Sequence, residues 1–397
     1  MVMTPRLAVL HVGKFYPPCP GGMERVVQML CEGVDPGIES SVLVANTGVS
    51  STRDELNGIQ VTRVGSFARI GTVAVTPTFP LELSRASRDL TVIHEPNPVA
   101  LVSDWLTAAK GPLVVWFHSE VFRPQWKYRL LYRPFLRRVL HRADRIVVSS
   151  PPLAEHSAEL HDFRAKCVVI PFGIDTNRLR RTDAVAEKVA AIQREIPGRR
   201  ALFVGRLVPY KGVGVLIQAM ASVDATALVV GDGPLSGALR QEADRHDVAD
   251  KVRFLGSLSD EDVVAHLHAC DVFTLPSVSN AETFGVAQLE AMACGKPVIS
   301  TALRTGVPWV NRHDETGLVV QPADPAALAR ALNSLLAAPD LRERMGAAGV
   351  HRVQTEFTLD AMNRRTAALY RTVMLERATE VAQAPAGHAS TAANTID

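Results

Sequence analysis

Short apolar runs alternate with longer stretches in which apolar and polar residues recur at helical spacing. In the first half, strands are predicted at residues 7–11, 41–45, 60–64, 91–94, 113–117, 146–149 and 168–170, and most of these are apolar runs. Continuous apolar runs of this length predict strands that are buried on both faces. Strands that alternate with helices indicate an α/β protein with parallel sheets.

The same pattern returns in the second half of the chain. Further apolar runs lie at residues 201–204, 227–230, 252–255, 272–275 and 298–299, and amphipathic helices are predicted at 213–220, 326–336, 341–357 and 359–376. A chain of 397 residues has room for about two domains. We expect domains at 1–172 and 173–357, a terminal helix at 358–380, and a small, polar, disordered tail at 381–397.

Composition narrows the range of partners. The net charge is only +2, which gives no bulk indication of a nucleic acid partner. The five cysteines form no CxxC motif, so we expect buried reduced thiols and a cytoplasmic protein. We see no signal peptide before the first strand and no apolar run as long as a membrane span.

One stretch, residues 272–301, combines a strand, a polar loop, a helix and another strand. Glu282 lies in the loop, and Glu290 lies two turns into the helix, which opens near Phe284 and Gly285. Ligands bind such units at the loops that leave the strands. Free backbone N–H groups around Thr283, Phe284 and Gly285 suit a phosphate or a sugar hydroxyl.

Two glycine-containing turns also follow predicted strands. Gly21 and Gly22 precede the helix at 23–30, and would allow close approach of a ligand to the backbone, although a plain turn would have the same glycines. Arg206 and Lys211 lie in the loop 205–212, where they could clamp a diphosphate. The loop does not have the Walker A spacing, and no GxGxxG motif with a following acidic residue is present.

Polar residues follow two strands of the first half. His94 and Asn97 come at the end of the strand 91–94, and His118 follows the strand 113–117. The carboxyl ends of parallel strands are where α/β sites form, so these residues are candidates for substrate contact. A histidine satisfied within a loop is the alternative.

Residues 123–145 are strongly basic. This stretch holds eight Lys or Arg residues against one acid, Asp144, with large apolar residues between them. Pro134 predicts two short helices rather than one. The stretch is either a solvated helical face or a docking surface for an anionic membrane.

Taken together, these motifs resemble the family 4 retaining glycosyltransferases, which have the GT-B fold. The resemblance rests on the E-x7-E segment from Glu282 to Glu290, on Gly205-Arg206-Leu207 with Lys211-Gly212, and on the opening Phe15-Tyr16-Pro17-Pro18 with Gly21-Gly22. It spans residues 6–376, and it looks most like bacterial mannosyl or rhamnosyl transferases of polysaccharide assembly. Many relatives have two adjacent glycines where this chain has Thr305-Gly306.

The resemblance implies two Rossmann-like domains that face a cleft, with the terminal helix crossing back to the first domain. It implies that Arg206 and Lys211 bind the donor phosphates, that His118 contacts the transferred sugar, and that Gly21 and Gly22 face the donor diphosphate and the acceptor. We further expect Glu290 at the ribose hydroxyls, Glu282 at the donor sugar, and His94 and Asn97 on the acceptor side.

The implied activity is retaining transfer of a hexose, with mannose or rhamnose favoured, from a nucleotide diphosphate sugar to a growing glycan or lipid-linked saccharide. We expect a GDP-sugar rather than a UDP-sugar, no cofactor and no metal, and a protein that is cytoplasmic or peripheral on the inner face of the membrane. The alternatives are a UDP-dependent glucosyl, galactosyl or N-acetylglucosaminyl transferase, a GT-B epimerase or phosphorylase, and a non-catalytic binding module.

Overall fold

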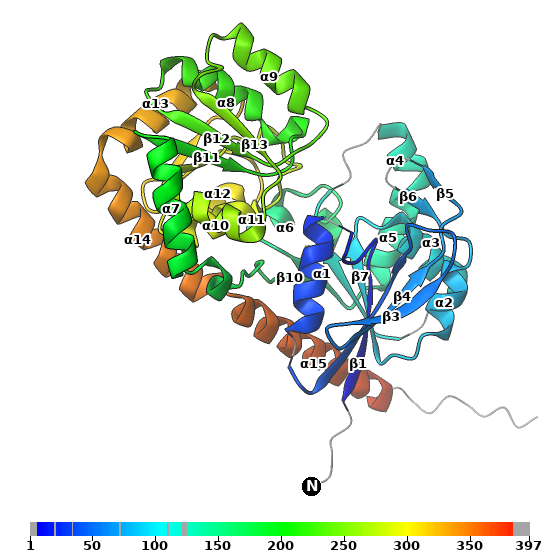
Figure 1. Cartoon of the computed structure of the whole chain (residues 1–397). Coiled ribbons are helices and arrows are strands. Elements are labelled where there is room, and N and C mark those ends of the chain that lie inside the picture. The colour runs from blue at the N-terminus through cyan, green and yellow to red at the C-terminus, as the bar shows by residue number, and fades with distance from the viewer. Residues whose placement is uncertain are drawn as a thin grey trace, which may run out of the picture.

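The computed structural model describes residues 6–19, 21–33, 35–70, 73–108, 111–120 and 125–383. Within these ranges the chain forms two α/β units, each built around its own mainly parallel sheet (Figure 1). The α/β class with two such units, predicted from the alternation of apolar runs, is therefore confirmed.

The first unit has an eight-stranded sheet over the described residues. Its order is β10 (Cys167–Val169), β9 (Arg145–Val148), β8 (Leu113–Phe117), β7 (Leu90–Glu95), β1 (Leu7–Val12), β2 (Ile38–Ala45), β4 (Ile59–Val64) and β3 (Thr52–Leu56). Only β3 runs antiparallel to its neighbour. The helices are α1 (Gly22–Glu32), α2 (Phe79–Arg85), α3 (Pro98–Thr107), α4 (Gln125–Leu131), α5 (Arg133–Arg142) and α6 (Pro151–His156), and β5 (Ala68–Ile70) with β6 (Val73–Val75) forms a separate ribbon.

The second unit has a six-stranded parallel sheet. Its order is β13 (Val252–Gly256), β12 (Thr226–Val230), β11 (Arg200–Val204), β14 (Val272–Leu275), β15 (Val298–Thr301) and β16 (Gly317–Val320). The helices are α7 (Asp183–Glu195), α8 (Val213–Ala219), α9 (Ser236–Arg245), α10 (Asp260–Ala269), α11 (Val286–Ala293), α12 (Val307–Val310), α13 (Pro325–Ala337) and α14 (Pro339–Glu356).

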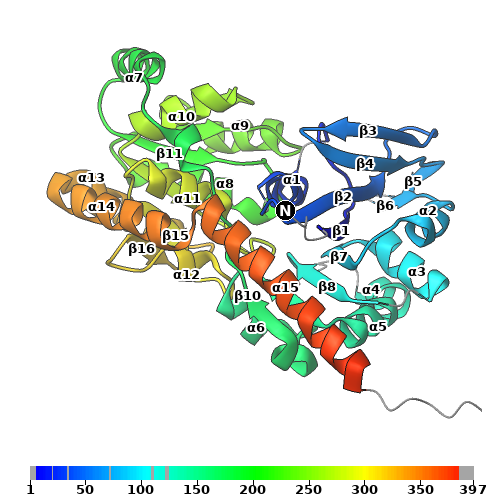
Figure 2. The ribbon, with the colours of Figure 1, turned by 90° about the horizontal axis from the view of Figure 1, so that it is seen from below.

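The last helix, α15 (Leu359–Gln383), ties the two units together. It begins beside the interdomain segment, residues 170–182 between β10 and α7, where Ile174 bridges Thr358. It then runs along the first unit (Figure 2). Arg371 of α15 pairs with Asp35 at 2.6 Å, and Glu376 pairs with Arg145 at 2.6 Å. The predicted disordered tail lies almost wholly outside the described residues, which end at Gln383.

The order of the strands determines where loops converge. In the first sheet β1 lies between β7 and β2, and in the second sheet β11 lies between β12 and β14. These are topological switch points, where the loops leaving the carboxyl ends of the strands diverge and leave a crevice. Most residues singled out in the sequence lie in loops that leave β1, β7, β8, β11 or β14.

Candidate active site between the two domains

A cleft of about 770 Å³ lies between the two units. Its first-unit wall comes from the loop after β1 and from α1, and includes Gly21 and Gly22. The opposite wall comes from the interdomain segment, α10 and α11, and includes Glu290. Two sites predicted from motifs more than 250 residues apart therefore line one cavity, which is large enough for a small-molecule substrate.

Glu290 is held in this cleft by an arginine that the sequence motifs did not indicate. Its Oε1 lies 3.3 Å from Nη2 of Arg178, which also pairs with Asp260 at 2.8 Å. Burial raises the pKa of Glu290, and the charge of Arg178 opposes this shift. Arg178 thus holds one oxygen of the carboxylate, and no partner of the other oxygen is found in the described part of the chain.

Lys211 and Glu282 form an ion pair at the carboxyl ends of the adjacent strands β11 and β14. Nζ of Lys211 lies 2.6 Å from Oε2 of Glu282, and the two side chains are only 13% and 10% exposed. The hydroxyl of Ser277 donates a hydrogen bond to the same carboxylate oxygen at 3.0 Å. Burial alone would lower the pKa of Lys211, but Glu282 and Tyr210 raise it overall, so this lysine is charged near neutral pH.

The backbone around Gly212 brings Lys211 to Glu282. Gly212 has φ of 67°, and a Cβ there would lie 2.0 Å from the carbonyl oxygen of Pro276. A side chain at this position is therefore excluded both by backbone strain and by lack of space. Arg206, at the start of the same loop, is exposed. Two cations thus lie on one strand-to-helix loop, one buried and one facing solvent.

The segment from Thr283 to Gly285 leads into α11 and is packed against its surroundings. Phe284 is 1% exposed, and its ring packs edge-on against Phe172 and Phe357. Gly285 has φ of 72° and precedes α11, and the carbonyl of Thr283 accepts a hydrogen bond from the N–H of Gly306. Because Phe284 and Gly285 are buried as whole residues, the ligand contact predicted for this segment stays a prediction.

His118 and His94 lie at the carboxyl ends of β8 and β7. His118 is 7% exposed, and its Nε2 lies 3.0 Å from Nδ1 of His94, which has no exposed surface. Phe172 stacks on His118 at 5.6 Å and contacts Phe284 at 5.1 Å, so one aromatic ring separates His118 from the second unit. The predicted substrate contact of His94 has no support here, because His94 lies behind His118.

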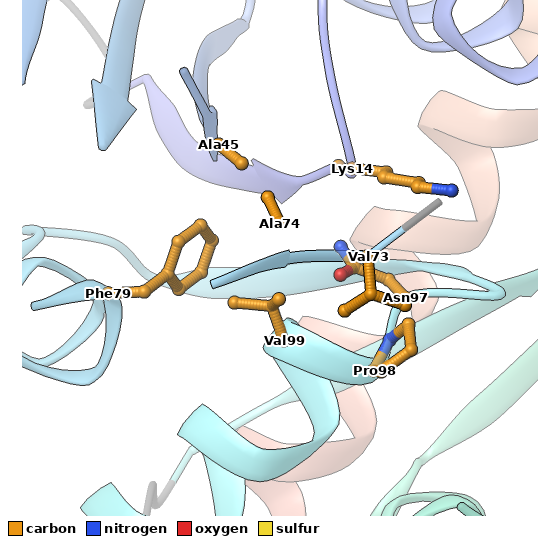
Figure 3. Close-up of a pocket in the computed structure, with 9 residues that line it drawn as sticks. Lys14, Ala45, Val73, Ala74, Phe79, Asn97, Pro98 and Val99 are labelled. Carbon is orange, nitrogen blue, oxygen red and sulfur yellow. The ribbon is translucent and has the colours of Figure 1, made fainter. Parts of the chain in front are cut away.

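Asn97 borders a different and much smaller cavity (Figure 3). Its Oδ1 accepts a hydrogen bond from the N–H of Ala100 and caps α3, while its buried Nδ2 has no hydrogen-bond partner among the described residues. The cavity also borders Lys14, Val73 and Phe79, and its volume of about 10 Å³ suits one water molecule rather than a sugar ring.

Comparisons with known proteins match this geometry. The family model described as Glycosyltransferase Family 4 matches residues 20–178, and the model described as Glycosyl transferases group 1 matches residues 190–352. A D-rhamnosyltransferase, WbpZ of Pseudomonas aeruginosa, is 34% identical over 89% of this chain and 92% of its own length. The O-antigen chain mannosyltransferase C of Escherichia coli is 30% identical over 93% of this chain and 99% of its own.

The chain belongs to glycosyltransferase family 4. Its fold is GT-B, because the structure of sucrose-phosphate synthase from Thermosynechococcus elongatus superposes with a TM-score of 0.79 over 94% of this chain and 100% of that one, at 23% identity. Both the family and the fold predicted from the motifs are thus confirmed.

This family 4 glycosyltransferase brings together some predicted residues and separates others. Gly21, Gly22 and Glu290 line the cleft, and Lys211 and Glu282 form one pair. Lys211, Glu282 and His118 are not among the residues that line the cleft, and His118 packs against Phe172, which contacts Phe284 of the second unit. Arg178, Asp260 and His11 were not anticipated, since no motif marks them. Across the described ranges, no cluster of three or more His, Cys, Asp or Glu side chains is placed to hold a metal ion.

Proposed function

We propose that this glycosyltransferase moves mannose or rhamnose from a nucleotide diphosphate sugar, with GDP as the favoured carrier, to a growing glycan or lipid-linked saccharide. The observation that carries the proposal is the buried Lys211–Glu282 pair, which lies in the loops that follow the adjacent strands β11 and β14. The choice of sugar is supported by the two relatives, which are named as a rhamnosyl and a mannosyl transferase.

Departure of the nucleoside diphosphate places negative charge on the leaving oxygen. Lys211 and Arg206, together with N–H groups at the start of α11, would stabilise that charge, and such preorganised donors are a large part of catalysis in closed sites. When Lys211 turns toward a diphosphate, Glu282 is released to accept a hydrogen bond from the donor sugar. Two side-chain cations could offset the charge of the leaving group without a metal.

Glu290 would accept hydrogen bonds from the ribose hydroxyls, and Arg178 holds it in place to do so. His118 would contact the transferred sugar from the opposite wall. The incoming acceptor hydroxyl then attacks from the face of the sugar that the diphosphate leaves and passes its proton to the departing phosphate oxygen, which gives retention at the anomeric carbon.

We further propose that the acceptor is met at an anionic membrane surface, through α4 and α5. Trp126, Leu130 and Leu131 of α4 are 61%, 68% and 68% exposed. Exposed aromatic and aliphatic side chains beside cations suit an interface. No described helix is long and apolar enough to cross a bilayer.

Several cations of α5 are already paired with acids of the protein and are therefore less available to an anionic membrane than the sequence indicates. Arg133 pairs with Glu159 at 3.1 Å, Arg137 with Asp162 at 2.8 Å, and Arg142 with Asp104. Because internal acids neutralise these arginines, the proposal rests more on the exposed apolar side chains of α4 than on charge.

A transfer assay tests the proposed function. Purified protein would be incubated with a bacterial lipid extract and radiolabelled GDP-mannose, GDP-rhamnose or UDP-glucose, with and without EDTA. We expect label from a GDP-sugar to enter the lipid fraction equally in both conditions, in a bond with the anomeric configuration of the donor. Label from UDP-glucose alone would overturn the GDP assignment, and release of epimerised or hydrolysed donor without transfer would overturn the transferase assignment.

A further inference from the structure

Three histidines from three neighbouring strands form one hydrogen-bonded chain behind the active site. Nδ1 of His11 lies 3.0 Å from Nε2 of His94, and Nδ1 of His94 lies 3.0 Å from Nε2 of His118. The rings are stacked, with centroids 5.3 Å apart in both pairs. His11 and His94 have no exposed surface, whereas 7% of the surface of His118 is exposed.

The register of the parallel sheet produces this row. His11 of β1 lies opposite Val92 of β7, and His94 lies opposite Trp116 of β8. Residues two apart on a strand share a face, so His94 lies on the face of Val92 and His11, and His118 lies on the face of Trp116. Each histidine is therefore displaced by two residues from the last, toward the carboxyl end of the sheet and the cleft.

Hydrogen bonding couples the proton positions along the chain. A neutral imidazole carries one N–H and one acceptor nitrogen, so each N···N contact needs one of each. Burial holds the pKa of His11 and His118 at about 3 and that of His94 well below its usual range, so all three rings are neutral near pH 7. Only two arrangements satisfy both contacts: every ring carries its proton on Nδ1, or every ring carries it on Nε2.

The buried end of the chain distinguishes the two arrangements. Nε2 of His11 is buried and has no hydrogen-bond partner in the described part of the chain. Protons on Nε2 would leave an N–H there without an acceptor, whereas protons on Nδ1 leave only a lone pair. An orphaned N–H is the rarer of the two defects in protein interiors.

We propose that His11 and His94 are positioning residues that hold His118 in the Nδ1–H tautomer, so that His118 donates a hydrogen bond to a substrate oxygen. Nε2 of His118 is occupied by His94, which leaves Nδ1 as the ring nitrogen available to a substrate oxygen. Trp116 and Phe172 stack against the ring at 5.9 and 5.6 Å, so the ring is held against a flip that would exchange its two nitrogens. Through these hydrogen bonds, His11 inside β1 sets the tautomer of His118.

Nitrogen-detected NMR of 15N-histidine-labelled protein tests the proposal without any substrate. His11→Asn keeps an N–H donor where Nδ1 was. His11→Asp, in which the side chain has the same shape as asparagine, places an acceptor there. We expect His118 to be Nδ1–H in the wild type and in His11→Asn, and to become mainly Nε2–H in His11→Asp. Replacement of the exposed His351 by Asn is the matched control and should leave the signals of His118 unchanged.

Two results would overturn the proposal: an Nε2–H tautomer of His118 in the wild type, or an unchanged tautomer in folded His11→Asp. If His11→Asp fails to fold, His94→Asn and His94→Asp apply the same test at the histidine next to His118. The wild-type spectrum by itself shows in which direction the hydrogen bonds between the three histidines run.

The catalytic consequence rests on the proposed role of His118. In the transfer assay, we expect His11→Asp to lower kcat more than it raises KM, while His11→Asn retains kcat. A reversed tautomer of His118 with unchanged kcat would support the coupling of the three histidines but remove His118 from catalysis. Failure of the tautomer proposal and failure of the catalytic role are therefore distinguishable.

Discussion

At the scale of single residues, the site consists of charges that are already balanced inside the protein. Lys211 pairs with Glu282, and Glu290 pairs with Arg178. Breaking a buried pair by removing one partner leaves an uncompensated charge, which is costly. A ligand that brings both a diphosphate and hydroxyl groups can replace these internal partners.

The first prediction concerns the two cations of the loop after β11. Lys211→Ala and Arg206→Ala should each weaken nucleoside diphosphate binding by about ten- to a hundredfold, because a hydrogen bond to a charged group contributes roughly 1.5–3 kcal/mol. Calorimetric titration measures this, with the exposed Arg330→Ala as control. Unchanged affinity in both variants, with melting curves that show a folded protein, would remove the phosphate assignment.

The second prediction separates the two carboxylates. Glu290→Gln should mainly weaken binding of the donor and of the free nucleotide, whereas Glu282→Gln should mainly lower kcat, since Glu282 is proposed to act on the sugar. Titration with free nucleotide and initial rates with the donor measure the two effects. Equal nucleotide affinity in the wild type and in Glu290→Ala would show that the ribose role is wrong.

The sequence could indicate Glu282, Glu290, Arg206 and Lys211 because each lies in or just after a loop that leaves a strand, within a recognisable motif. It could not indicate Arg178 or His11. Arg178 reaches Glu290 across 112 residues. His11 lies inside a buried strand, where a histidine ordinarily indicates only a satisfied core residue. The register of β1, β7 and β8 gives it a role.

At the scale of elements, apolar runs predicted most of the buried strands, whereas β3, β5, β6 and β16 were not predicted. Every strand predicted in the sequence is present, usually with ends that differ by one or two residues. The missed strand β3 has the sequence TRDEL and is exposed along most of its length. An edge strand of this kind has no buried face, so its pairing with β4 leaves no hydrophobic pattern to detect.

The third prediction belongs to α4. Leu130→Asp with Leu131→Asp should abolish co-sedimentation with anionic vesicles, because both side chains are exposed and would enter the interface. Leu375→Asp on α15, which is 69% exposed in the wild type, is the matched control and should bind normally. Equal co-sedimentation of all variants at low salt would leave α4 and α5 as a solvated helical face.

At the scale of the whole molecule, two units meet at a cleft, and the C-terminal helix α15 returns from the second unit to pack on the first. Its buried face includes Tyr370 and Val373, and its ion pairs join it to Asp35, Asp144 and Arg145 of the first unit. The motifs implied this returning helix, but its contacts depend on residues hundreds of positions away. Such contacts follow from the packed fold and have no local signal.

The fourth prediction is that acidification destabilises the protein. The unfolded chain protonates its histidines as the pH falls through about 6.5, but folded His11 and His118 resist until about pH 3, so stability is lost over that interval. Glu95 has the opposite effect on stability, because burial raises its pKa in the folded protein to about 7 and it takes up a proton before the unfolded chain does. This is one proton, against two for His11 and His118.

Urea unfolding at pH 7, 6 and 5 measures this dependence. The stability of His11→Asn should fall less steeply with pH than that of the wild type, because one buried neutral histidine is removed. Below about pH 6.5 the difference is roughly a factor of ten in the folding equilibrium constant per pH unit. A slope equal to that of the wild type would show that His11 titrates normally in the folded state.

Nucleotide binding tests the central claim most directly, because it requires no knowledge of the acceptor. Melting temperatures would be measured with GDP, UDP, ADP and TDP for the wild type and for Glu290→Ala. A ligand that binds only the folded state at a hundred times its Kd adds about 2.7 kcal/mol of stability. We predict that GDP raises the wild-type melting temperature most and that Glu290→Ala loses the increase; no increase with any of the four nucleotides would contradict the account.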